Sequence, residues 1–206
     1  GWELDKSHSS VGFTVRHLMV SDVRGEFKDF TVALTPDEKD FTKSMVEATI
    51  PVAGIDTRDE KRDGHLKSAD FFDVEKFPIM TFKSKSITKA GKGKYKMKGD
   101  LTLHGVTKEA TLDLEAPAKP VKSPWGTDVY GVQATGKINR KDFGLTWNKV
   151  LDGGGLALGE EVKIAINVEF VKKPPEQKKP DTQSGAGEKK EEKKEEKKDT
   201  PPQGGK

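Results

Sequence analysis

The chain has 206 residues, with 37 Lys and Arg against 34 Asp and Glu, so its formal net charge is only +3. The longest run of apolar side chains is three residues, whereas a membrane-spanning helix needs about 20. We therefore expect neither a transmembrane segment nor a basic patch that binds nucleic acid. Cysteine is absent, which excludes disulfides, thiolate catalysis and cysteine-ligated zinc.

Residues 174–206 differ in composition from the rest of the chain. They hold nine Lys, eight Asp or Glu, five of the eleven prolines and one hydrophobic residue, Ala186. Such a segment cannot bury enough apolar surface to offset the entropy of ordering it. Over residues 188–198, Glu and Lys alternate in pairs, so residues four apart carry like charges, which disfavours a helix. We predict one domain over residues 1–173 and a disordered Lys/Glu-rich tail over 174–206; a weak tether to a charged surface stays open.

Within the domain, apolar and polar residues alternate with a period of two, the pattern of a strand with one buried and one exposed face. Val11, Phe13 and Val15 show this pattern early in the chain. Strands that are apolar on one face only favour an antiparallel sheet. In chain order, the pattern predicts eight strands, near residues 3–17, 23–34, 44–52, 79–87, 94–103, 106–116, 127–138 and 161–171.

The segments between the strands carry turn and helix signals. Residues 59–73 lack the period of two and are rich in helix-compatible residues, so we predict one or two short helices that cap one end of the sheet. Glycine-containing turns at residues 91–93 and 104–105 fit hairpins. Eight antiparallel strands of this kind form a closed barrel or a sandwich. An eight-stranded barrel can hold one small ligand, but apolar stripes more often pack as a solid core, and the pattern alone favours that core.

The four histidines offer little catalytic signal. His8, His17, His65 and His104 show no short metal-ligand spacing, so we expect no metal site. His104 is explained by its turn. For His17 and His65, a partly buried imidazole bonded to backbone or carboxylate is favoured over a general base, because no nucleophile motif accompanies them. GxSxG, P-loop and GxGxxG motifs are absent, and we predict no catalytic residue and no cofactor.

Residues 139–147 form the most singular local stretch. Arg140 and Asp142 flank a lysine, and Phe143, Leu145 and Trp147 then alternate, which predicts an extension of the seventh strand or a short ninth strand. One interpretation is a structural latch, in which the two charged residues pair or cap neighbouring backbone while the aromatic residues pack. The other places the aromatic residues in a ligand pocket, and both can hold together.

Several short sequence motifs are spread, in a fixed order, over the whole length of the domain. They are residues 2–18, 23–27, 57–59, 63–66, 70–73, 77–84, 99–108 and 139–145. Together they resemble the YceI-like family of lipid- and polyisoprenoid-binding proteins. Met19 departs from the resemblance, since a smaller residue is expected there.

The resemblance implies an eight-stranded antiparallel lipocalin-like barrel with one or two short capping helices. It also implies an apolar cavity for a long isoprenoid or fatty-acyl chain, and so favours a cavity over a solid core. The implied function is non-catalytic binding of such a lipid for carriage, storage or sequestration. The alternative is an enzyme that acts on a lipid with His17 or His65 as base.

The same resemblance suggests site residues and a location. The candidate ligand-binding residues, from the apolar strand faces and the cap, are Phe13, Val15, Phe27, Phe71, Phe72, Phe82, Leu101, Leu103, Phe143 and Trp147. We interpret His17, His65, Arg140 and Asp142, which match the family motifs, as cavity-end or scaffold residues. A periplasmic or secreted location is implied, and the start at Gly1 fits either a removed signal peptide or a trimmed chain. A homodimer stays open.

Overall fold

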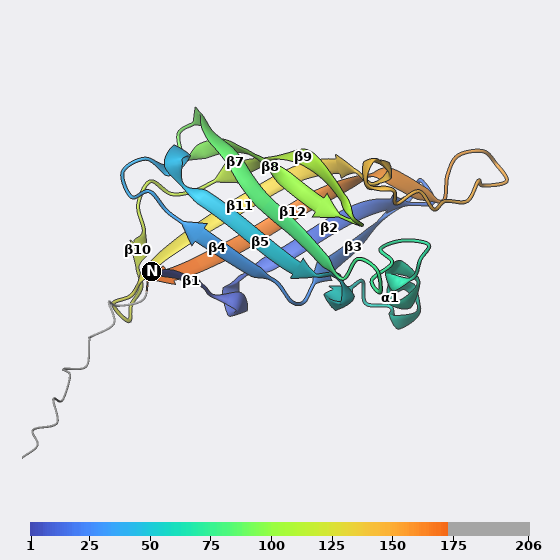
Figure 1. The fold of residues 1–206 in the computed structure, drawn as a ribbon, viewed down its shortest axis with the longest axis horizontal. Helices are drawn as coiled ribbons and strands as arrows, with labels where there is room; N and C mark the ends of the chain where they lie inside the picture. The colour runs from blue at the N-terminus through green and yellow to red at the C-terminus, as the bar shows by residue number, and fades with distance from the viewer. Residues whose placement is uncertain (173–206) are drawn as a thin grey trace, which may run out of the picture. The chain divides into compact units, whose positions relative to one another are not determined.

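The computed structural model describes residues 1–172, which form one curled antiparallel sheet and one α-helix (Figure 1). The strands are β1 (Trp2–Leu4), β2 (Ser10–His17), β3 (Ser21–Phe27), β4 (Thr31–Thr35), β5 (Met45–Pro51), β6 (Ile55–Asp56), β7 (Ile79–Gly91), β8 (Lys94–Leu103), β9 (Val106–Glu115), β10 (Val121–Lys122), β11 (Asp128–Asn139) and β12 (Leu158–Lys172). All their pairings are antiparallel, as predicted. The predicted tail lies outside the described residues.

The sheet is a strongly curled half-barrel. Ten strands pair in the order β4-β5-β7-β8-β9-β11-β12-β2-β3-β6, while β1 pairs with β12 and β10 with β11. No ladder joins the edge strands β4 and β6 within residues 1–172. The prediction of a closed ring of eight strands was therefore wrong in strand number and closure, whereas the antiparallel sheet with a helix was correct.

Two predicted strands are interrupted, which accounts for two of the four extra strands; β6 and β10 are the other two. The first divides into β1 and β2 because the Asp5 carboxylate accepts a hydrogen bond from the Ser7 N–H, at 3.0 Å, and caps a 3-10 turn, Lys6–His8. The second divides into β3 and β4, because β3 ends at Phe27, paired with β6, and the chain begins a new pairing with β5 at Thr31. The hydrogen bond at Asp5 competes with sheet pairing and leaves no mark on the alternation of apolar residues.

The two hairpin predictions are confirmed. Leu103 pairs with Val106 across His104 and Gly105, whose φ angles are 54° and 72°. Both angles are positive, as a two-residue type I′ turn requires. At the other end of β8, Gly91 pairs with Lys94 across a two-residue turn.

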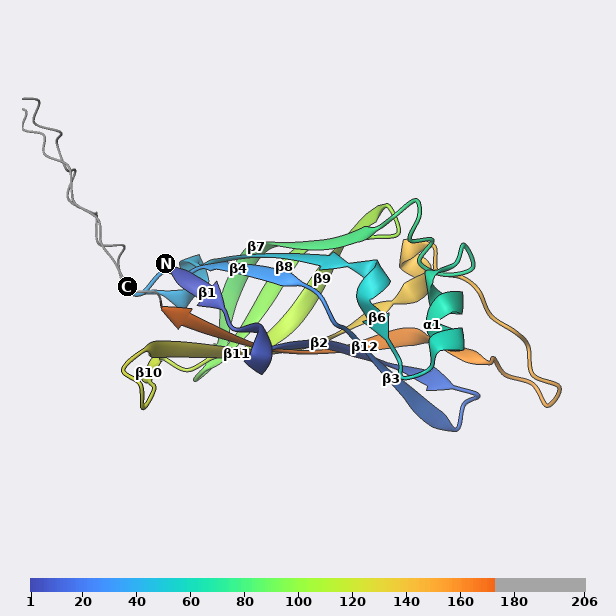
Figure 2. The ribbon, with the colours of Figure 1, turned by 90° about the horizontal axis from the view of Figure 1, so that it is seen from below.

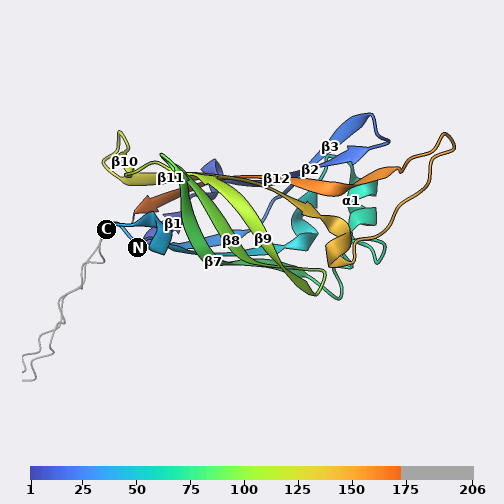
Figure 3. The ribbon, with the colours of Figure 1, turned by 90° about the horizontal axis from the view of Figure 1, so that it is seen from above.

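The helix α1 (Glu60–Lys67) falls inside the segment predicted to be helical, and turns follow it. It begins after Asp59, whose side chain accepts a hydrogen bond from the Arg62 N–H at 2.9 Å. Three further 3-10 turns are Phe41–Lys43, Val52–Gly54 and Arg140–Phe143. Seen from below and from above, α1 lies at one end of the curled sheet (Figures 2 and 3).

The curl brings the apolar faces of distant strands toward one another. In Figure 2, β4 and β7 lie over β2, β11 and β12, and the inner faces of these strands carry the buried hydrophobic residues. Val52 and Phe170 are the most completely buried, at 1% and 2% exposure. The interior of this sheet is where a site for an apolar ligand can form.

Candidate functional site: an apolar cavity with one polar end

The curled sheet encloses a cavity of about 260 Å³ whose exposed wall is apolar. An apolar wall of this kind suits the hydrocarbon chain of a lipid.

Eight of the ten candidate ligand-binding residues line this cavity. They are Phe13, Val15, Phe27, Phe71, Phe72, Phe82, Leu101 and Leu103. Leu103 is 3% exposed and Leu101 7% exposed, so the inner face of β8 is shielded from bulk water. The alternation of apolar residues therefore located most of the wall, although their role in binding stays a prediction.

Glycines on neighbouring strands set the positions of two of these aromatic rings. Phe13 on β2 pairs with Gly25 on β3, and its ring lies where a Cβ at Gly25 would stand. The ring of Phe82 on β7 covers Gly99 on β8 in the same way. A side chain at either glycine would displace the ring, so these glycines help to shape the cavity wall.

Phe143 and Trp147 do not line the cavity, so the predicted strand and their predicted place in the wall were wrong. Residues 140–143 form a 3-10 turn that ends at Gly144, where φ is 77°, and this turn breaks the alternation. Phe143 is 2% exposed and packs in the core instead. Trp147 packs against the cap, with its ring centroid 5.1 Å from that of His65, edge-on, and 5.2 Å from that of Phe71, at a tilt.

The polar residues that border the cavity gather at the α1 end. They are His17, Thr57, Arg62 and Arg140. His17 ends β2 and pairs with Leu158, whose carbonyl lies 3.4 Å from the Arg140 guanidinium. The helix belongs to the same end, because the His65 ring contacts Trp147 and the Trp147 carbonyl accepts a hydrogen bond from Arg140 at 2.9 Å. The cavity thus combines an apolar wall with one polar end.

Arg62 and Thr57 are the wall residues that sequence reasoning missed. Arg62 donates to the Thr57 hydroxyl at 2.8 Å and to the Thr57 carbonyl at 2.6 Å. Thr57 in turn donates its N–H and its hydroxyl to the Asp63 carboxylate, at 2.9 and 2.5 Å. Thr57 and Asp63 lie in the stretches that carry the family resemblance, which was the available signal, whereas Arg62 lies between two of them. Together the three residues hold α1 against the edge of the cavity.

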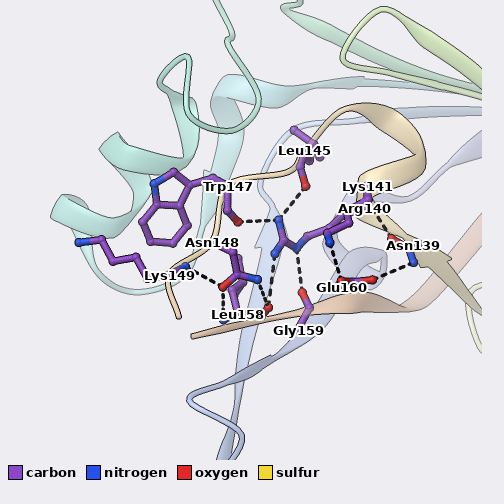
Figure 4. Close-up of polar contacts among 10 residues, drawn as sticks. All are labelled: Asn139, Arg140, Lys141, Leu145, Trp147, Asn148, Lys149, Leu158, Gly159 and Glu160. Carbon is purple, nitrogen blue, oxygen red and sulfur yellow. Dashed lines mark hydrogen bonds and ion pairs between the residues drawn. The ribbon is translucent and has the colours of Figure 1, made fainter. Parts of the chain in front are cut away.

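Arg140 is the structural latch, but its partners are backbone carbonyls (Figure 4). Arg140 is 3% exposed, and its guanidinium donates to the carbonyls of Gly159 at 2.8 Å, Leu145 at 2.7 Å and Trp147 at 2.9 Å. Burial lowers the pKa of Arg140, and the nearby Glu160 carboxylate opposes this shift. These bonds tie the segment after the turn to the start of β12.

Asp142 takes no part in the latch. It is exposed, and no ion pair joins it to Arg140 within residues 1–172. The predicted alternative in which the two charges pair is therefore wrong, and backbone capping by Arg140 is the correct alternative. Asn148 completes the latch, because its side chain donates to the Leu158 carbonyl at 2.7 Å and accepts from the Leu158 N–H at 3.0 Å (Figure 4).

The other histidines have structural partners. His65 lies outside the cavity lining, and its Nε2 is 2.8 Å from the Asp70 carboxylate, which fits the structural interpretation. The Nδ1 of His104 is 3.0 Å from the Phe143 carbonyl, beside the hairpin turn. Of the two histidines considered as bases, only His17 borders the cavity.

One group in residues 1–172 brings metal-ligating side chains together. Atoms of Asp5, His8 and Glu169 lie within 4.8 Å of one another. Asp5 already accepts hydrogen bonds from Ser7, at 3.0 and 2.6 Å, and lies 2.8 Å from the His8 ring. Capping and an exposed ion pair account for this arrangement without a metal.

No helix in the described part of the chain has the length and apolarity to cross a bilayer.

The fold and site define a class: antiparallel β-proteins whose curled sheet encloses one apolar cavity. The model of the YceI-like domain matches residues 2–170. The chain therefore belongs to the YceI-like domain family.

Comparison with individual proteins agrees with this assignment. UPF0312 protein SA2479 of Staphylococcus aureus (strain N315) is 43% identical over 166 residues, covering 81% of this chain and 94% of the relative. The crystal structure of a Campylobacter jejuni YCEI protein superposes with a TM-score of 0.64 at 35% identity, covering 83% of this chain and 97% of the other.

A more distant structure has the same fold. It is described as a polyisoprenoid binding domain from Saccharophagus degradans implicated in plant cell wall breakdown. Its TM-score is 0.60 at 14% identity, with 82% of this chain and 97% of the other covered. At this identity the likeness shows the fold alone.

Proposed function

We propose that this protein binds one long-chain isoprenoid or similar amphiphilic lipid without catalysis, and so carries, stores or sequesters it. The observation that carries the proposal is the apolar cavity of about 260 Å³ inside the curled sheet. The distant structural neighbour described as a polyisoprenoid binding domain supports the same class of ligand.

The ligand lies with its chain along the apolar wall and its head group at the α1 end. A head group cannot be buried among Phe and Leu side chains without a partner for its polar atoms. His17 borders the cavity at the α1 end and offers such a partner. The guanidinium groups of Arg62 and Arg140 already donate hydrogen bonds, to Thr57 and to four backbone carbonyls respectively, so they support the wall and leave the head group to His17.

The direct test is mass spectrometry of an organic extract from the purified full chain. The proposal predicts one long-chain lipid, in a ratio near one per protein. If lipid-free protein, refolded from denaturant, takes up no long-chain lipid, the proposal is wrong.

A matched pair of variants links binding to the cavity. Leu103→Lys places a charge in the apolar interior and should abolish binding, because burying an unpaired ammonium group is very costly. Thr107→Lys adds the same charge at an exposed position of the same hairpin and should leave binding unchanged. Ala134→Phe is an uncharged alternative that fills the cavity from β11 and should also block long chains. Binding is measured by displacement of a fluorescent polyene fatty acid, with circular dichroism to show that each variant folds.

A further inference from the structure

Two loops project together at the α1 end of the sheet (Figures 2 and 3). The first is the turn Leu18–Val20 between β2 and β3, and the second is the segment 149–157 before β12. They are joined, since the Leu18 N–H donates to the Ala157 carbonyl at 2.8 Å. The sulfur of Met19 lies over Gly155, where a Cβ would collide with it. We call these two loops the two-loop tip.

The two-loop tip exposes large apolar side chains on adjacent backbone. Leu18 is 41% exposed, Met19 60%, Val20 74% and Val150 79%. Single exposed apolar residues are ordinary, but a contiguous group that projects from the surface marks an interaction site. This group is half of the eight large hydrophobic residues exposed in residues 1–172.

The backbone of the turn strengthens this inference. Leu18 and Met19 have φ angles of 49° and 63°, and the Val20 N–H donates to the His17 carbonyl at 3.1 Å. This is a turn with two positive φ angles, where Asn and Gly are strongly preferred and a bulky side chain is strained. Leu and Met at these positions carry a backbone cost and are only partly buried in return. Their side chains therefore fit a role in contact with another molecule. Such a role also explains why residue 19 is Met and not the smaller residue expected there.

The tip is continuous with the polar end of the cavity. His17, which borders the cavity, immediately precedes the turn, and Leu158, which also borders it, immediately follows the second loop. A surface that engages the tip is thus next to the place where a lipid would pass between cavity and surroundings.

Charge and size indicate the kind of partner. Around the tip, Arg16 lies 3.4 Å from Asp22, and the positive charge of Lys149 in the second loop is offset by the negative charge of Asp152, which directly precedes the glycines. The tip is therefore apolar with balanced charge. A stable dimer needs about 20–30 residues a side, far more than two narrow loops provide. Narrow loops with apolar ends can instead enter the boundary between head groups and acyl chains.

We propose that the two-loop tip docks this protein on a lipid bilayer and places the α1 end of the cavity against it. This inference deepens the proposed function and rests on it for its purpose, since a lipid carrier must exchange its cargo with a membrane. Docking itself is measured separately from binding in the cavity. Because the charges balance, docking needs no anionic lipid.

The test is flotation of the full chain with phosphatidylcholine vesicles. The wild type should float with the vesicles, also in about 1 M salt, where charge interactions are screened within about 3 Å. The double variant L18N/M19G should lose at least about tenfold in partitioning, because it removes two of the four exposed apolar side chains. Asn-Gly is the preferred pair for this turn, so the variant should melt at the same temperature or higher.

Trp125→Ser is the matched control. Trp125 is 87% exposed at the turn before β11, at the end of the sheet away from α1 (Figure 1), so its loss should leave flotation unchanged. The proposal is overturned if the wild type does not float, if L18N/M19G floats as well as the wild type, or if Trp125→Ser alone abolishes flotation. A change in oligomeric state in L18N/M19G would also overturn it, in favour of contact between copies.

L18N/M19G should still take up free long-chain lipid. Flotation without any such uptake by the wild type would refute the cavity function and leave docking intact.

Discussion

Removal of the buried guanidinium of Arg140 tests the latch most sharply. Arg140→Met keeps much of the side-chain volume and removes three short hydrogen bonds, to the carbonyls of Leu145, Trp147 and Gly159. Hydrogen bonds from a charged donor contribute about 1.5–3 kcal/mol each, or about 4.5–9 kcal/mol for three. Deletion also removes the cost of burying the charge, which is several kcal/mol.

The net loss should therefore be about 3 kcal/mol of unfolding free energy. For a domain of this size, that lowers the melting temperature by about 6–12 °C. Arg140→Lys retains the charge but cannot reach three carbonyls at once, so it should fall between Arg140→Met and the wild type. The assay is thermal and denaturant unfolding followed by circular dichroism.

Asp142→Ala is the control for this measurement. Asp142 is exposed and contributes nothing to the latch, so its removal should change stability by less than about 0.5 kcal/mol. Equal losses for Arg140→Met and Asp142→Ala would refute the reasoning and restore the ion pair. The folded fraction of Arg140→Met should still bind lipid, since its guanidinium supports the wall and does not hold the ligand.

Two further predictions concern packing and pH. Gly99→Ala should cost about 1–3 kcal/mol of unfolding free energy, because its Cβ would collide with the Phe82 ring. Gly131→Ala should cost less, because the nearest atom to its Cβ would be 3.9 Å away. Urea unfolding compares the two variants, and equal costs would contradict the packing argument. The Asp5 carboxylate raises the pKa of His8, so this pair stabilises the fold fully below pH about 6.5, and the contribution is lost as the pH rises through the raised value. His8→Gln should abolish this part of the pH dependence of unfolding, and a profile that matches the wild type would show that the pair contributes nothing.

The alternation of apolar residues predicted most of the sheet because it reports directly which strand face is buried. It also located most of the cavity wall, including Phe82 and Leu103. It could not show where strands break, since Asp5 interrupts the first strand through a local hydrogen bond that leaves the alternation intact. The alternation reports only which face of a strand is buried, so it also could not show that the sheet stays open between its edge strands.

The stretch after β11 was predicted to be a strand but is not one, because contacts between residues far apart in the sequence shape its backbone. Its apolar residues alternate, but Arg140 draws the backbone of Leu145 and Trp147 around its guanidinium, and its third partner, Gly159, is 19 residues away. No local pattern contains such a contact. The cap residues Thr57 and Arg62 were missed similarly, because their place at the cavity depends on how α1 folds against the sheet edge.

The most direct test of the central claim is a titration of the lipid-free protein with a series of chain lengths that share one head group. Each buried methylene contributes about 0.8 kcal/mol, and association costs about 4–15 kcal/mol. A chain below about twelve carbons should therefore bind weakly or not at all. Affinity should rise with chain length, and chains of about twenty carbons or more should bind tightly. Equal affinity for short and long chains, or no binding at any length, would contradict the account.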